Sequence, residues 1–131
     1  MPKAKQITAW LESKPGELGR VTGALGKAKV NITALSAWSV AGESPIRLLV
    51  SSPAKAKKVL GNLGIRCTEE EVLCVTLANE AGTLGEVGTR LGAANINVDY
   101  AYGSVAESGK KADVVLAVSD LAGAIKALRG L

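Results

Sequence analysis

Histidine is missing from the 131-residue chain, and its absence excludes much of the chemistry that enzymes use. Without it there is no imidazole to act as a general acid or base, to activate a serine or cysteine, or to bind a metal. Phe is also absent and aromatic residues make up only 3% of the chain, so the core has to be built from Ala, Val, Ile and Leu. With 47% apolar and 21% charged residues, the chain still has the composition of a folded protein.

Cysteine and long apolar runs are scarce as well. Cys67 and Cys74 are the two thiols, and they do not form a C-x-x-C pair, so we interpret both as core or strand residues and expect no metal and no cofactor. No apolar run approaches the roughly 20 residues that a membrane helix needs. The N-terminal lysines are not followed by the apolar segment of a secretory signal. We therefore expect a cytoplasmic protein without a membrane partner.

The net charge of +4 is unevenly distributed. Residues 1–66 carry eleven Lys and Arg against three acidic residues, net +8, whereas residues 67–131 carry five against nine, net −4. A nucleic-acid-binding protein is more often basic throughout, so no nucleic acid is expected as a partner. Unlike halves attract each other within a chain or between subunits, although drift of solvated surfaces explains the same split.

An internal repeat is the strongest feature that is present. Shifted by 66 positions, Lys14-Pro-Gly-Glu-Leu-Gly19 falls on Glu80-Ala-Gly-Thr-Leu-Gly85, and Val30-Asn31-Ile32 falls on Ile96-Asn97-Val98. Past the middle of each copy the shift becomes 68, which is typical of an insertion at a hairpin tip. Two copies are too few for a solenoid, which needs about three or more stacked units. The repeat therefore predicts a duplicated small module, with one copy at residues 1–68 and the other at residues 69–131.

Each copy shows the same order of expected elements. Residues 7–12 alternate between apolar and polar, which is the period of a strand with one buried face. Leu18, Val21 and Leu25 then recur at the spacing of an amphipathic helix, and two strands and a second helix follow. With residues 65–68 as a fourth strand of the first copy, the order predicts an α+β fold of two tandem ferredoxin-like (βαββαβ) modules, each an antiparallel sheet with helices on one face.

The second copy lacks an obvious last strand, because the sequence stops at Leu131 directly after its last expected helix. In the usual strand order, the first strand of that copy would then have an unpaired edge. An unpaired edge invites pairing with another chain. We therefore expect another segment or another chain to cover it.

Two Gly-rich turns, residues 13–19 and 79–85, are the first candidate binding sites, because each joins a strand to a helix start. Glycine permits close approach to the backbone, and the free N–H groups of a helix start suit a carboxylate or phosphate. Neither turn has the spacing of a phosphate loop or a dinucleotide fingerprint, and a tight turn that only reverses the chain explains the same residues. Asn31 and Asn97 open the next strand in each copy; their amides either bind a ligand or complete a turn.

Together these motifs resemble the ACT domain, a small regulatory module attached to many enzymes of amino-acid biosynthesis. The shared pattern is a strand, Pro-Gly-x-Leu-Gly, a helix, and Val-Asn-Ile at the next strand, and it recurs in register across residues 5–130. As a whole, the chain is similar to stand-alone bacterial tandem ACT proteins without a catalytic domain. The resemblance implies a non-enzymatic regulatory protein that binds a small amino acid at an interface between modules, as a homodimer and without catalytic residues.

The resemblance also implies which residues contact the ligand: those of the strand-to-helix loop and those that open the second strand. Loop N–H groups would hold the ligand carboxylate, and Asn31 or Asn97 its polar end. In the first module the residues are Ser13, Lys14, Gly16, Glu17, Leu18, Gly19, Asn31 and Ile32, and in the second they are Asn79, Glu80, Gly82, Thr83, Leu84, Gly85, Asn97 and Val98.

The second module departs from the family pattern, because Ala81 replaces the loop proline and the last strand is missing. An alternative function is that of a regulatory or interaction subunit of a separately encoded amino-acid metabolic enzyme. Acetolactate synthase is one such enzyme, and the loop motif of the second copy also resembles that of its small subunit. The uneven charge favours this alternative if the basic half stays uncovered in the free protein.

Overall fold

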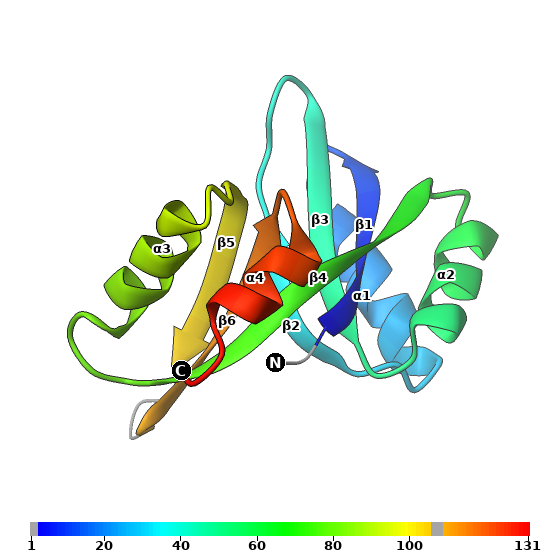
Figure 1. The fold of residues 1–131 in the computed structure, drawn as a ribbon. Coiled ribbons are helices and arrows are strands. Elements are labelled where there is room, and N and C mark those ends of the chain that lie inside the picture. The colour runs from blue at the N-terminus through cyan, green and yellow to red at the C-terminus, as the bar shows by residue number, and fades with distance from the viewer. Residues whose placement is uncertain (1–2, 106–108) are drawn as a thin grey trace. The chain divides into compact units, whose positions relative to one another are not determined.

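A computed structural model describes residues 3–105 and 109–131 of the chain (Figure 1). Its elements follow the order that the repeat predicts, except that the last strand of the first copy and the first strand of the second form a single strand. They are β1 (Lys3–Glu12), α1 (Glu17–Lys27), β2 (Ile32–Ala37), β3 (Glu43–Val50), α2 (Pro53–Asn62), β4 (Cys67–Ala78), α3 (Thr83–Ala93), β5 (Val98–Val105), β6 (Lys111–Val118) and α4 (Leu121–Ala127). Within these described ranges, no helix has the length and apolar character needed to span a bilayer.

The chain divides into two compact units. The first unit is Lys5–Glu70, and the second is Glu71–Leu131 together with the start of the chain up to Ala4. β4 contributes to both, because its first residues, Cys67–Glu70, belong to the first unit and the rest to the second. The repeat predicts the end of one strand and the beginning of another here, and the structure joins them into one.

The first unit has the strand order β2-β3-β1-β4, which is that of a ferredoxin-like module. β3 is antiparallel to both β1 and β2, and Leu48 is opposite Ile7 on one side and Leu35 on the other. Alternate residues of β1 point to the helix layer, where Ile7 packs with Leu25 of α1 and Leu60 of α2. Each of these three side chains is fully buried. Burial of a Leu or Ile side chain stabilises a fold by roughly 1.5–3 kcal/mol.

The second unit repeats this plan with the order β5-β6-β4, in which β6 is antiparallel to both neighbours. Leu73 of β4, Leu91 of α3 and Leu128 after α4 form its core. β1 is the other neighbour of β4, and Lys3 and Ala4 of β1 belong to this unit. The start of β1 therefore stands where the missing last strand of the second copy would be. The expectation that another segment covers this edge is met by the chain's own first strand.

The duplication extends to backbone conformation. Gly16 and Gly82, which precede α1 and α3, have φ values of 88° and 89°. Lys29 and Asn95 are both left-handed, at 64° and 58°, after the ends of the same two helices. Residues that correspond by the 66-residue shift thus share even their left-handed backbone conformations. The two copies in the sequence therefore have the same local structure.

Candidate ligand-binding site

The loop between β1 and α1 leaves the start of α1 open. Gly16 ends the loop in the left-handed conformation, and its carbonyl accepts the first helical bond, from the N–H of Arg20 at 2.9 Å. No side chain among the described residues caps the helix. Within the described part of the chain, the N–H groups of Leu18 and Gly19 donate no hydrogen bond. Free N–H groups at a helix start, together with the positive end of the helix dipole, favour an anion.

Two ion pairs flank this loop. The Glu17 carboxylate accepts bonds from Arg20 Nε at 2.9 Å and from Arg20 Nη2 at 3.1 Å, and Glu17 is only 7% exposed. The hydrogen bonds from Arg20 lower the pKa of Glu17, and the same contact raises the pKa of Arg20. The second pair joins Lys14 Nζ to Glu12 Oε2 at 3.3 Å, and both of its side chains are well exposed. The first pair is therefore fixed, whereas the second is free to rearrange.

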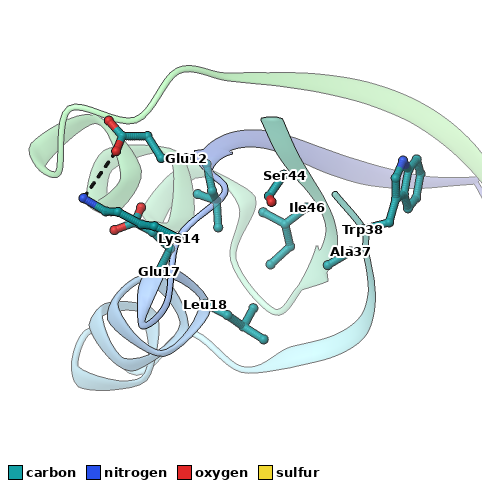
Figure 2. A pocket seen from close by; sticks show the side chains of 9 residues that line it. Glu12, Lys14, Glu17, Leu18, Ala37, Trp38, Ser44 and Ile46 are labelled. Carbon is teal, nitrogen blue, oxygen red and sulfur yellow. Dashed lines mark ion pairs between the residues drawn. The ribbon is translucent and has the colours of Figure 1, made fainter. Parts of the chain in front are cut away.

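An apolar cavity of about 190 Å³ lies on one side of the loop. Figure 2 shows Leu18, Ala37, Trp38 and Ile46 around it, with the charged ends of Glu12, Lys14 and Glu17 turned to the other side. The cavity is smaller than the roughly 300–1,000 Å³ of pockets for drug-sized ligands, so its size suits a small side chain. We call it the apolar cavity.

A second cavity, of about 170 Å³, lies between the loop and the turn from α2 to β4. We call it the charged cavity, because Glu12, Lys14, Glu17 and Arg20 line it, together with Trp10, Leu11 and the turn residues Leu63–Ile65. Leu11, Glu12, Lys14 and Glu17 line both cavities. The loop is thus the shared wall of two adjoining cavities that differ in character.

Ser13 joins the loop to the connection between β2 and β3. Its Oγ lies 2.7 Å from Oγ of Ser39, next to Trp38. The guanidinium carbon of Arg47 lies over the ring of Trp38, 4.4 Å from the ring centroid. Ser13 therefore holds the loop against the end of β2, and its hydroxyl is already hydrogen-bonded.

Asn31 lies at the other end of α1. Its N–H donates to Ser51 Oγ and its carbonyl accepts from the Ser51 N–H, both at 2.9 Å, which connects the start of β2 to the end of β3. The neighbouring Ile32 packs against the core. The eleven residues of α1 span about 16 Å, so one copy of the unit does not bring Asn31 and its own loop together.

The corresponding loop of the second unit has the same backbone but different side-chain contacts. Asn79 donates from Nδ2 to the Gly109 carbonyl at 3.1 Å and from its N–H to the Lys110 carbonyl at 2.8 Å. Leu84 is 55% exposed, like its counterpart Leu18 at 49%. The start of α3, with Thr83 and Gly85, also receives no cap from any side chain in residues 3–105 and 109–131, and Glu80 precedes it.

Asn97 lines a cavity of about 210 Å³ with Asn95, Ser119 and two neighbours, at the far end of α3 from the Gly82 loop. Its N–H donates to Ser119 Oγ at 2.9 Å, as Asn31 does to Ser51, and its Nδ2 donates to Asp99 at 2.8 Å. Val98 beside it packs against the core. The loop and the Asn are again separated within one unit.

Sequence reasoning missed Arg20 and Trp38 as neighbours of the site. The signal for Arg20 was present, because Glu17 and Arg20 have the i, i+3 spacing of a helical ion pair. The position of Trp38 follows from the register of β2 and β3, which the sequence does not specify. Among the described residues, no group of three or more His, Cys, Asp and Glu side chains is placed to hold a metal ion.

Comparisons with known proteins agree with this architecture. A family model described as an ACT domain pair matches residues 3–125. Protein BT0572 from Bacteroides thetaiotaomicron has a similar crystal structure, with 31% identity, a TM-score of 0.91, and coverage of 97% of this chain and 87% of that one. The regulatory subunit of aspartate kinase from Thermus thermophilus, in its ligand-free form, shares the fold at 14% identity and a TM-score of 0.67, covering 97% and 95%. A search of curated protein sequences finds no match.

Proposed function

The chain belongs to the ACT domain family, and from this premise we propose that it is a non-catalytic regulatory protein that binds a small amino acid. ACT domains are regulatory modules for small molecules such as amino acids, and the Thermus structure that shares this fold is a regulatory subunit. The observation that carries the proposal is the uncapped start of α1 between two small cavities. The cytoplasm, where free amino acids are made and used, is the proposed location.

In the proposed mode of binding, the N–H groups of Leu18 and Gly19 receive the ligand carboxylate. They are the free donors of the first turn, and the helix dipole places positive potential there. Gly16 permits the close approach of the ligand to the loop, because it presents no side chain. Ligand binding in this mode makes and breaks no covalent bond. It therefore acts by shifting the equilibrium between alternative packing arrangements of the protein.

The proposed interface between copies is the free edge of β2. Residues 31–42, which contain this strand, include no charged residue and no proline. Leu35, Trp38 and Val40 are 42%, 41% and 56% exposed. Natural edge strands usually carry charges or prolines that prevent pairing, so an unprotected edge with apolar neighbours favours pairing with a second copy of the chain. We therefore infer a homodimer in which two β2 strands pair in antiparallel fashion.

Antiparallel pairing would also complete the ligand site. β2 begins beside Asn31 and ends beside Trp38 and the loop, about 20 Å further on. When two such edges pair in opposite directions, Asn31 of the partner subunit comes next to the loop. The site would then contain both groups that a single unit keeps apart, and ligand binding would depend on the dimer.

A thermal-shift screen of the protein against the twenty amino acids tests this function. A ligand at about 100 times its dissociation constant stabilises the fold by about 2.7 kcal/mol, which corresponds to roughly 5–15 °C for a chain of this size. We expect one or two amino acids to raise the melting temperature, and Gly16→Val, which alters the loop of the proposed binding mode, to abolish the shift while the variant still folds. No shift with any amino acid would contradict the proposal.

The second candidate is a regulatory subunit of a separately encoded amino-acid metabolic enzyme, such as acetolactate synthase. The solved regulatory subunits of aspartate kinase, which share the fold, favour it. In that case the purified chain would show no amino-acid shift alone and would form a complex of defined stoichiometry with the enzyme. Sedimentation of the two purified proteins together, with the chain alone as the control, separates this candidate from the first.

A further inference from the structure

The two loops have the same backbone and opposite charge. Gly16 and Gly82 agree in φ to within a degree, and both helices that follow are uncapped. The charged positions around the loops do not agree. The first unit has Lys14, Glu17 and Arg20 at these positions. The second unit has Glu80, Thr83 and Glu86 in their place.

The charged cavity of the first unit is complementary to a zwitterion. Two acidic and two basic side chains line it, and the Glu17–Arg20 pair is held in place by two hydrogen bonds. The Glu12–Lys14 pair is exposed, and such surface pairs contribute little to stability, so its two ends can turn to a ligand at low cost. A ligand ammonium would pair with Glu12, and a ligand carboxylate with Lys14 and the open start of α1.

The adjoining apolar cavity restricts the side chain of that ligand. Its walls include Leu18, Trp38 and Ile46, and it shares Leu11, Glu12, Lys14 and Glu17 with the charged cavity, with the charged ends of the last three turned away from it (Figure 2). A buried charged or amide side chain without partners would be penalised there by the loss of its hydration. The volume of about 190 Å³ admits a small or medium side chain.

We propose that the loop of the first unit alone binds the ligand, and that the ligand is a free α-amino acid with a small apolar side chain. This inference rests on the proposed function and adds the selected unit and the ligand class. The charged cavity receives the ammonium and carboxylate groups, the apolar cavity receives the side chain, and Asn31 of the partner subunit completes the site in the proposed dimer.

The acidic residues of the second loop disfavour the binding of a ligand carboxylate there. Glu80 and Glu86 stand where the first loop has Lys14 and Arg20, so a ligand carboxylate would find neither cation of the first loop and would meet the acidic side chain of Glu80. Of the basic residues near this loop, Arg90 pairs with Glu86 at 3.1 Å and donates to the Arg129 carbonyl at 2.9 Å, and Lys110 contacts the loop through its backbone carbonyl, which accepts from the Asn79 N–H at 2.8 Å. Like-charge repulsion near a helix start opposes the attraction of the helix dipole for an anion.

Titration calorimetry of the full chain tests the proposal. The probes are L-alanine, L-valine, L-leucine, L-aspartate and L-lysine, with N-acetyl-L-valine and L-valine methyl ester as derivatives that lack one charge. We expect an apolar amino acid to bind with one ligand per chain, and both derivatives to bind at least about tenfold more weakly, because each loses a charge-assisted contact.

A matched pair of variants locates the site. Lys14→Gln should weaken binding by about tenfold or more, because it removes the cation that faces the ligand carboxylate. Glu80→Gln changes the corresponding residue of the second loop and should leave the affinity unchanged. Both side chains are exposed, so folding is not at risk, and unchanged melting temperatures without ligand check this.

The possible outcomes test separately the assigned unit, the ligand class and the proposed function. Two ligands per chain, or equal effects of Lys14→Gln and Glu80→Gln, would overturn the assignment to the first unit while the proposed function stands. Tight binding of L-aspartate or L-lysine in preference to the apolar probes would overturn the ligand class. No binding of any amino acid in the calorimeter or in the thermal-shift screen would overturn the inference together with the function on which it rests.

Discussion

Replacing Gly16 by Ala should destabilise the protein through the backbone alone. Gly16 has a φ of 88°, and a Cβ placed there would meet no atom within 4 Å. The cost is therefore that of holding an L-residue in a left-handed conformation, about 1–2 kcal/mol. Gly19 lies three residues further on, inside α1, where an added Cβ also meets nothing within 4 Å. Ala there should stabilise the helix by roughly 0.5–1 kcal/mol.

The two variants differ by the same methyl group, so their opposite signs isolate backbone conformation. Urea unfolding followed by circular dichroism should give midpoints on either side of the parent value with unchanged slopes, and the free energies of unfolding should differ by about 1.5–3 kcal/mol. Gly82→Ala and Gly85→Ala repeat the comparison in the second unit, since Gly82 has a φ of 89°. A neutral or stabilising Gly16→Ala would show that the loop does not adopt the left-handed conformation from which α1 begins.

Three further results are expected. Arg20 holds the pKa of Glu17 below its ordinary value of 4.5, so the ion pair stabilises the fold above about pH 4.5 and loses this contribution as the pH falls through the lowered folded-state pKa. The difference in free energy of unfolding between the parent and Glu17→Gln, measured by urea unfolding, should therefore be smaller at about pH 3 than at about pH 7. An unchanged difference would argue against the ion pair. Leu60→Ala and Leu128→Ala remove fully buried side chains from the two cores, so each should lower the free energy of unfolding by about 2–5 kcal/mol in the same assay, and a loss in only one unit would mean that the cores are not equivalent. Leu35→Lys places a charge on the free edge of β2 and should convert the dimer to monomers in sedimentation velocity, whereas a variant that stays dimeric would place the interface elsewhere.

The module architecture follows from the sequence because local signals agree with each other. The alternation of β1, the helical spacing of Leu18 and Leu25, and their recurrence 66 residues later each predict the same order of elements. Duplication strengthens the prediction from a weak motif. The turn at Pro15-Gly16 is better supported because Ala81-Gly82 falls on it in register. The left-handed Gly16 and Gly82 belong to this part of the fold, which local sequence determines.

The parts that sequence does not determine depend on contacts between distant residues. Nothing local indicates that Lys3 and Ala4 join the second unit, because strand order is set by the packing of the whole chain. The separation of Asn31 from its loop likewise follows from the length and direction of α1, although both motifs are visible in the sequence. The charged cavity needs the turn at Gly64 to come near Arg20, a contact over more than forty residues.

Complementation between two binding-deficient chains tests the shared site most directly. Gly16→Val damages the loop and Asn31→Ala removes the amide that the partner is proposed to contribute, so neither variant should bind the amino acid alone. In a mixed dimer, the intact loop of the Asn31→Ala chain lies beside Asn31 of the partner subunit, which carries Gly16→Val. After the two variants are unfolded together and refolded, calorimetry should recover one site per mixed dimer with the parent affinity. Absence of binding in the mixture, with dimers formed, would contradict a site shared between two copies.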